Sequence, residues 1–427
     1  MPRRFRLLVD VEPLKWSAAF RRLWVGNTLS SIGGALTSFA VILQIYRLTH
    51  SSFAVGALGL AQVIPLLTVG LLAGSVTDAV DRRRLALITG TMQTAVSVAL
   101  AAQAFAGLRM TGLLYGLVAV QSAVAAIDWP TRAALVPSLL PVEQRTAGLA
   151  LIRLSFQVVL VVGPALAGVI TAAPHLGLRA CYLIDVISFA ASLYGVLRLP
   201  ALPPQTAARP GWRAAAEGAR FIRRSPPLAG AFLADLNATV FGLPIALFPA
   251  INAARFGGSP RTLGLFTAAI GAGGLVSAAL SGPLRHLARP GRAMLITVAI
   301  WGGAFAGFAL ARSLWLTLTL LAVAGGADTF TVVFRGAILQ EVTPEPLRGR
   351  VMATDFVVGA GGAQLGNLEA GALGSLTSPA ISALTGGLAT VAGALVISVL
   401  LPSFYRYRWG GQQENSVPIR ETRPDLS

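Results

Sequence analysis

The chain has 427 residues, of which 55% are hydrophobic and only 12% are charged. Soluble domains carry about 25% charged residues, so this composition excludes a water-soluble globule. The formal net charge of +17 is compatible with nucleic-acid binding, but the placement of the basic residues along the chain argues against a nucleic-acid partner.

Apolar runs of about twenty residues, the length that a helix needs to cross a bilayer, alternate with short polar segments. A helix is the expected element because it pairs its backbone groups inside its own segment. The sequence therefore predicts an all-α membrane protein with twelve transmembrane helices, at residues 24–46, 53–73, 85–107, 112–131, 147–172, 177–197, 228–251, 262–284, 293–311, 314–335, 352–374 and 379–402.

Basic residues are distributed unevenly between the loops on the two sides of the predicted membrane. With the N-terminus inside, most of the 34 Lys and Arg residues lie inside. Those predicted to lie outside are Arg47, Arg109, Arg179, Arg255, Arg261 and Arg312, and those at or within helix ends are Arg132, Arg153 and Arg335. Cytoplasmic loops show this excess of basic residues, so we expect both termini in the cytoplasm and anionic lipids as partners of the basic face. We expect the protein to be a monomer in the bacterial inner membrane.

A polar segment rich in Pro and Arg divides the predicted helices six and six. We expect a cytoplasmic tail (1–22), a six-helix bundle (23–198), a cytoplasmic linker (199–227), a second six-helix bundle (228–402) and a second cytoplasmic tail (403–427). Within the linker, residues 212–224 are predicted to form a surface amphipathic helix.

The two halves contain an internal repeat after helices 4 and 10. Arg132, Ala134, Pro141 and Arg145 recur at a constant offset as Arg335, Ala337, Pro344 and Arg348. Parallel repeats of six helices around a midplane cavity are the architecture of one large transporter class. The repeat therefore predicts two pseudo-symmetric bundles.

The loop after helix 2 contains Gly74, Asp78, Arg82 and Arg83. This spacing resembles the loop 2–3 motif of the major facilitator superfamily, although the basic residue after the aspartate is Ala79 here and the second glycine is Asp81. The resemblance implies a conformational latch, in which a carboxylate at a helix end pairs with the other half in one state only. The alternative is that the arginines only anchor an inside loop.

Helix 5 contains Gly163, Pro164 and Gly168, which resemble the Gly-Pro motif of exporters and proton antiporters in that superfamily. Val159 and Ala167 replace glycines of the fuller motif. Proline removes a backbone donor and glycine permits close helix approach, so the segment is expected to bend where the halves meet or to serve as a packing kink.

Most of the chain resembles the enterobactin (catecholate siderophore) exporter branch of the superfamily. The stretches that carry this resemblance begin at Gln44, Leu199, Ser281 and Leu339. Multidrug and macrolide pumps share several of them, but many of those pumps have an acid in helix 1 where this chain has Gly34.

Five acids at predicted membrane depth are candidates for proton coupling, because a charge there costs about 2.5 to 3.5 kcal/mol on insertion scales. They are Asp235, Asp128, Asp185, Glu369 and Asp328. Asp235, beside Asn237, is the first choice because it is expected to have no close cation.

Each of the other acids has a structural alternative. Asp128 is spaced for an i,i+4 ion pair with Arg132, and Asp185 is expected to cap a helix or to pair with Arg179 or Arg153. Asp328 and Glu369 lie in glycine-rich helices and are candidates to line a cavity. Asp355, close to Arg350 in the sequence, is expected to be structural.

Polar residues on the predicted helices are candidates to line the substrate cavity. They are Asn27, Ser31, Gln44, Arg153 and Asn237. Their alternative role is hydrogen bonding between helices, worth about 0.6 kcal/mol per contact.

These features predict a secondary exporter of a siderophore-like or lipophilic small molecule, driven by proton antiport and alternating access. The alternatives are a multidrug or macrolide pump of the same fold and, remotely, a membrane enzyme. The only lysine, Lys15, follows no Gly-rich loop, which excludes an ATP-driven pump within this chain. One cysteine and three loop histidines predict no metal site and no cofactor.

Overall fold

The computed structural model describes residues 10–199, 212–282 and 287–408, although the side chains of residues 71–79, 212–215, 346 and 353 lie outside the description. All secondary structure in these ranges is helical, which confirms the predicted all-α fold.

The helices of the first half follow the predicted spans, preceded by the short α1 (Glu12–Trp16). They are α2 (Ala18–Thr49), α3 (Ser52–Ala79), α4 (Arg82–Phe105), α5 (Thr111–Leu139), α6 (Val142–Ala172) and α7 (Gly177–Leu197). Several extend beyond the apolar run that predicted them, since polar residues end the hydropathy signal before they end the helix. The clearest case is α5, which includes Arg132 and Pro137.

The second half begins with the linker helix α8. Its elements are α8 (Trp212–Arg224), α9 (Pro226–Phe241), η1 (Ile245–Leu247), α10 (Phe248–Arg255), α11 (Pro260–Ala279), α12 (Pro290–Leu310), α13 (Leu314–Val342), η3 (Glu345–Leu347), α14 (Arg348–Leu376), α15 (Pro379–Leu400) and α16 (Pro402–Tyr405).

Eleven segments in the described part of the chain are long and apolar enough to cross a membrane, with α9 to α10 counted as one. The remaining predicted span, 352–374, corresponds to α14, which has the required length at 29 residues. Gln364, Asn367 and Glu369 lower its hydropathy. A helix of this kind is expected where neighbouring helices, rather than lipid, surround it.

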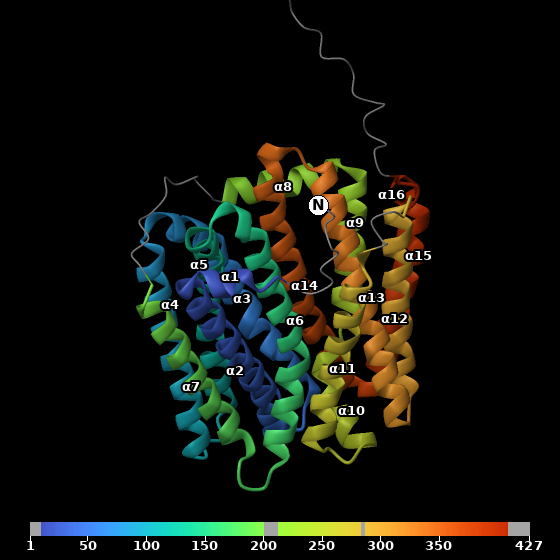
Figure 1. Ribbon diagram of the computed structural model, residues 1–427. Coiled ribbons are helices and arrows are strands. Elements are labelled where there is room, and N and C mark those ends of the chain that lie inside the picture. The colour runs from blue at the N-terminus through green and yellow to red at the C-terminus, as the bar shows by residue number, and fades with distance from the viewer. Residues whose placement is uncertain (1–9, 200–211, 283–286, 409–427) are drawn as a thin grey trace, which may run out of the picture.

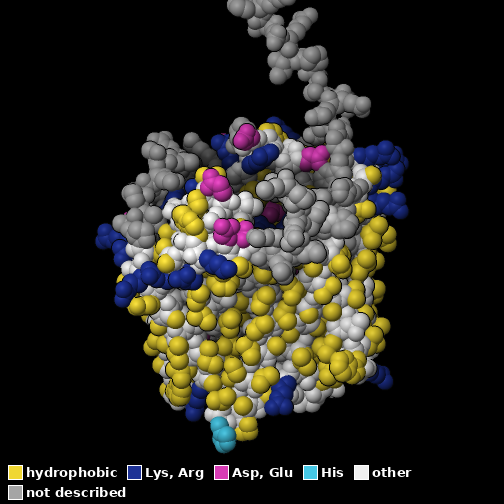
Figure 2. Space-filling model, in the orientation of Figure 1, with side chains coloured by type: hydrophobic (Ala, Val, Ile, Leu, Met, Phe, Trp, Pro, Cys, Tyr) yellow, Lys and Arg dark blue, Asp and Glu magenta, His cyan; other side chains and the backbone are white. Residues whose placement is uncertain are grey.

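The long helices lie side by side, with the first half in blue to green and the second in yellow to red (Figure 1). We call the end where α8 and α16 lie the α8 end, and the opposite end, where α10 lies, the α10 end. On the face shown in Figure 2, hydrophobic side chains form a broad band across the middle, and Lys and Arg gather mainly at the α8 end. This distribution is that of a protein surrounded by lipid.

Helices α2 to α7 pack mainly on one another, as do α9 to α15. The two groups meet mainly along two helix pairs, α6 with α11 and α3 with α14. Glycines allow the close approach: a Cβ at Gly168 of α6 would lie 2.7 Å from the Pro260 oxygen of α11. At the other pair, a Cβ at Gly56 would lie 3.2 Å from Gly371 Cα.

The predicted helix 228–251 is interrupted in the structure. α9 ends at Phe241, and the chain resumes as η1 and α10 after Gly242 and Pro244. Proline has no backbone N–H to continue a helix. The side chain of Asn367 in α14 accepts a hydrogen bond from Ala246 N at 3.1 Å, so the break gains a partner from a neighbouring helix.

The linker contains a helix over the predicted residues, Trp212–Arg224. Gly218 and Ile222 are buried on one face, while Arg220 and Arg223 are exposed on the other. Glu217 pairs with Arg350 of α14. These contacts confirm an amphipathic helix and attach it to the second half.

Candidate functional site

Arg132 of α5 is the centre of a polar cluster in the first half. Its Nε lies 2.7 Å from Asp128 Oδ2, which confirms the predicted i,i+4 ion pair. Its Nη1 donates to Asn27 Oδ1 of α2 and to Ser192 Oγ of α7, each at 2.7 Å. The Thr89 hydroxyl of α4 donates to Asp128 at 2.6 Å. The cluster therefore joins four helices of one half.

Arg335 of α13 occupies the corresponding place in the second half. It pairs with Asp235 of α9, and its Nε lies 3.0 Å from Asp355 Oδ1 of α14. The prediction that Asp235 has no close cation is wrong, because a residue one hundred positions away supplies it. Arg350, five residues before Asp355 in the chain, pairs with Glu217 instead.

A third acid, Asp328 of α13, is half-buried and close enough to Asp235 and Arg335 to interact with them electrostatically. Two carboxyl groups, on α9 and α14, thus pair with one guanidinium group, and a third carboxyl group on α13 lies near them. Buried carboxylates in excess of their cations repel one another, and a bound proton relieves that repulsion. We call this set the Arg335 cluster. Binding or release of a proton by one of its acids can change how the acids pair with Arg335.

The clusters are linked by two aromatic residues that sequence reasoning missed. Trp129 and Phe356 directly follow Asp128 and Asp355 in the chain. Their rings stack across the two halves with centroids 5.6 Å apart. No pattern within either helix indicates this contact, because it depends on how α5 and α14 face each other.

Asp185 of α7 is fully buried and lies apart from both arginines. Its Oδ2 accepts hydrogen bonds from the Thr37 and Ser97 hydroxyls, each at 2.8 Å. The predicted pairing with Arg179 or Arg153 is wrong: within the described residues Arg179 donates to Ala104 O, and Arg153 is exposed. Asp185 connects α7 to α2 and α4 through neutral donors.

The remaining site candidates are not brought together. Asn237 donates to Thr390 O of α15 at 2.8 Å, and Gln44 bonds to Gln103 and Tyr182 inside the first half. Ser31 is exposed on α2, and Glu369 is half-buried on α14.

The side chain of Asp78 and the surroundings of Gly74, near the end of α3, lie outside the description, so the latch stays a prediction. Arg83 donates to Leu197 O at 2.8 Å, and Arg82 donates to Ala134 O at 3.4 Å. Both arginines therefore bind helix-end carbonyls of their own half.

The helix 5 motif lies in two interfaces. A Cβ at Gly163 would contact Ala35 of α2, within the first half. Gly168 and the Pro164 oxygen instead face Gly264 of α11, in the second half. The motif thus lies where the halves meet.

Among the described residues, no group of three or more His, Cys, Asp or Glu side chains is arranged to hold a metal ion. The site therefore consists of ion pairs, hydroxyl groups and amides in helices.

Comparison with known proteins matches residues 10–419 to the family described as "Transmembrane secretion effector". The enterobactin exporter EntS of Citrobacter koseri is 28% identical over 420 residues, which cover 96% of this chain and 99% of the relative. Among solved structures, the nucleoside transporter NupG aligns with a TM-score of 0.69 at 15% identity, over 92% of this chain and 100% of that one. A bacterial homologue of the iron transporter ferroportin, in an inward-facing state, aligns with a TM-score of 0.68 at 17% identity, over 91% and 99% of the two chains.

Proposed function

Since this chain belongs to the major facilitator superfamily of membrane transporters, we propose that it exports a small organic molecule across the bacterial cytoplasmic membrane in exchange for protons. The chain is a multi-pass transporter and not an enzyme. The direction of transport, its coupling to protons and the identity of the substrate are parts of the proposal.

The observation that carries proton coupling is the Arg335 cluster. Asp235 and Asp355 share one arginine, and Asp328 lies near them, so adding a proton to one acid changes how strongly Arg335 holds the other partner. The acids lie on three helices, and one of these, α14, contacts α3 of the first half. Proton binding can therefore alter contacts between the halves, as alternating access requires.

The glycine contacts support the same mechanism. They lie between α6 and the beginning of α11, which follows α10, so the halves touch toward the α10 end. In the proposed cycle these contacts separate when substrate leaves. The helix 5 motif and the latch formed by Gly74, Asp78, Arg82 and Arg83 are proposed to control that movement.

The substrate is proposed to be siderophore-like, because relatives that match nearly the whole chain are named enterobactin exporters. With both termini placed in the cytoplasm, the α8 end faces inward and its basic residues face anionic lipid. We propose that the transporter acts as a monomer.

Transport into inside-out proteoliposomes with an imposed pH gradient tests this function. A catecholate siderophore should accumulate when the lumen is acidic, and collapse of the gradient by a protonophore should abolish accumulation. Accumulation of lipophilic drugs but not of catecholates would assign the chain to the drug-pump alternative. Accumulation that does not depend on the pH gradient would reject proton antiport.

A further inference from the structure

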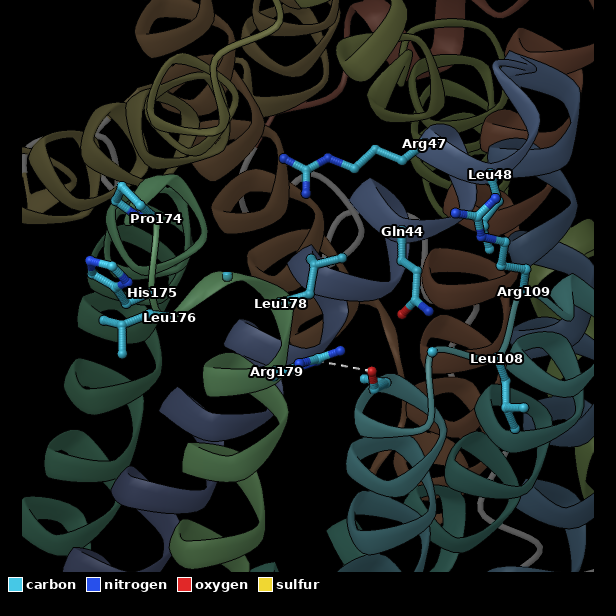
Figure 3. Close-up of a pocket in the computed structure, with 13 residues that line it drawn as sticks. Gln44, Arg47, Leu48, Leu108, Arg109, Pro174, His175, Leu176, Leu178 and Arg179 are labelled. Carbon is cyan, nitrogen blue, oxygen red and sulfur yellow. Dashed lines mark hydrogen bonds between the residues drawn. The ribbon is translucent and has the colours of Figure 1, made fainter.

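A cavity of about 410 Å³ lies at the α10 end of the first half (Figure 3). It is lined by the end of α2, the loop between α4 and α5, and the segment that joins α6 to α7. No residue of the second half lines it. The cavity is thus separate from the Arg335 cluster and from the two main helix pairs between the halves, α6 with α11 and α3 with α14.

Three arginines from three segments line this cavity: Arg47, Arg109 and Arg179. They are half of the six arginines that the sequence places on the outer side, against the general excess of basic residues inside. Like charges that gather at one place repel one another. No acidic residue is among the residues that line the cavity.

The arginines have unused hydrogen-bonding capacity. In the described part of the chain, Arg47 and Arg109 make no side-chain hydrogen bond or ion pair. Arg179 uses its Nε to donate to Ala104 O at 3.1 Å, a contact drawn in Figure 3, and its terminal nitrogens have no hydrogen-bond partner among the described residues. By contrast, Arg255, also on the outer side, donates to three carbonyls at the end of α12.

The floor of the cavity is fixed and uncharged. Gln44 lines it and is held by the Tyr182 hydroxyl at 2.6 Å and by Gln103 Nε2 at 3.2 Å. The rim is shaped by Gly107 and Gly177, whose φ values of 67° and 60° suit glycine better than other residues.

We propose that this cavity binds an organic oxyanion. Guanidinium groups pair with carboxylate and phosphate oxygens in a two-point geometry, and the cavity volume falls in the range that holds small organic ligands. The same chemistry is offered by an acidic small molecule outside the cell and by the headgroup of an anionic lipid. This inference concerns binding alone and does not depend on the proposed export.

Calorimetric titration of the full chain in phosphatidylcholine nanodiscs with citrate tests the site. Citrate should bind saturably, and Arg47→Gln with Arg109→Gln should weaken binding by about tenfold or more. The matched control is Arg261→Gln with Arg312→Gln, which removes two outer arginines that do not line the cavity and should leave citrate binding unchanged. Arg179 is kept because its contact with Ala104 holds α7 to α4.

Nanodiscs that contain phosphatidylglycerol separate the two sources of the anion. If the lipid headgroup enters the cavity, phosphatidylglycerol should weaken citrate binding to the unsubstituted chain. If a soluble acid is the ligand, citrate binding should be the same in both lipids. Equal citrate binding by the two double variants, or the absence of saturable citrate binding in phosphatidylcholine nanodiscs, would overturn the proposal.

Discussion

Two arginines at equivalent positions, Arg132 and Arg335, have different kinds of partner. They lie equally far from the ends of α5 and α13. Arg132 pairs with Asp128 of its own helix and with neutral side chains. Arg335 pairs with acids of two other helices. The first arrangement stabilises one half, whereas the second can respond to a proton.

Asp235→Asn should abolish export driven by a pH gradient, while passive substrate exchange persists, because Arg335 keeps Asp355 as a partner. Proteoliposome flux with and without the gradient measures both activities. Asp355→Asn is the matched control, since it removes the other partner of the same arginine and is expected to retain coupling. Full coupled flux in the Asp235 variant would contradict this assignment.

Arg132→Gln should destabilise the protein by about 3 kcal/mol, because it leaves the half-buried Asp128 without its cation. Adding Asp128→Asn should recover much of that loss. Denaturation in detergent measures the effect, and the double-variant cycle shows whether the two residues interact. If the second substitution worsens stability additively, the pair does not act as a unit.

The sequence predicted the ion pair between Asp128 and Arg132, which are four residues apart. It missed the pair between Asp235 and Arg335, which are one hundred residues apart. Spacing on one helix fixes which side chains meet, but contacts between helices depend on how the helices are rotated. The constant offset between Arg132 and Arg335 was the available signal. Once Arg132 was expected in a buried pair, its repeat partner indicated a second buried cation.

At the scale of elements, glycines set how closely the two halves approach. Gly168 of α6 faces the backbone of Pro260 and Gly264 in α11, so even one methyl group has no space there. Such contacts serve van der Waals packing, which drives helix association in lipid.

Gly168→Ala should separate the halves at the α10 end and reduce transport several-fold, with little change in expression. Spin labels on α6 and α11 would report the wider distance. Gly112→Ala is the control, because a Cβ at Gly112 of α5 has no neighbouring atom within 4 Å. An unchanged distance distribution would show that the contact does not limit closure.

The sequence predicted that the elements are helices. It predicted less well where each helix ends and where a helix is interrupted. Hydropathy located each span, yet α5 continues to Leu139, beyond the predicted end at 131. The interruption at Gly242 and Pro244 lay inside an apolar run. Gly242 and Pro244 can be read from the sequence. An apolar run does not show, however, whether Asn367 of another helix can accept a hydrogen bond from the backbone after the break.

At the scale of the whole molecule, the uneven distribution of Lys and Arg predicts orientation. The α8 end carries most of the basic side chains in Figure 2 and is proposed to be cytoplasmic. The single cysteine, Cys181, is buried, so its replacement gives a background for labelling single sites.

In that background, His175→Cys should react with a membrane-impermeant maleimide in intact spheroplasts. Arg220→Cys on α8 should react only after lysis. Both residues are exposed on the protein, which makes them matched reporters of opposite faces. Labelling of Arg220→Cys in intact spheroplasts, with His175→Cys protected, would invert the proposed topology.

The interruption between α9 and α10 has a consequence for the order of movements. α9 carries Asp235 and its ion pair, whereas α10 forms part of the opposite end and is joined to α9 through Gly242 to Pro244 and the short η1. We propose that the outer segment can move at this break while the inner one stays in place. We expect the transporter to pass through an occluded intermediate, shut to both compartments, instead of rocking as two rigid blocks.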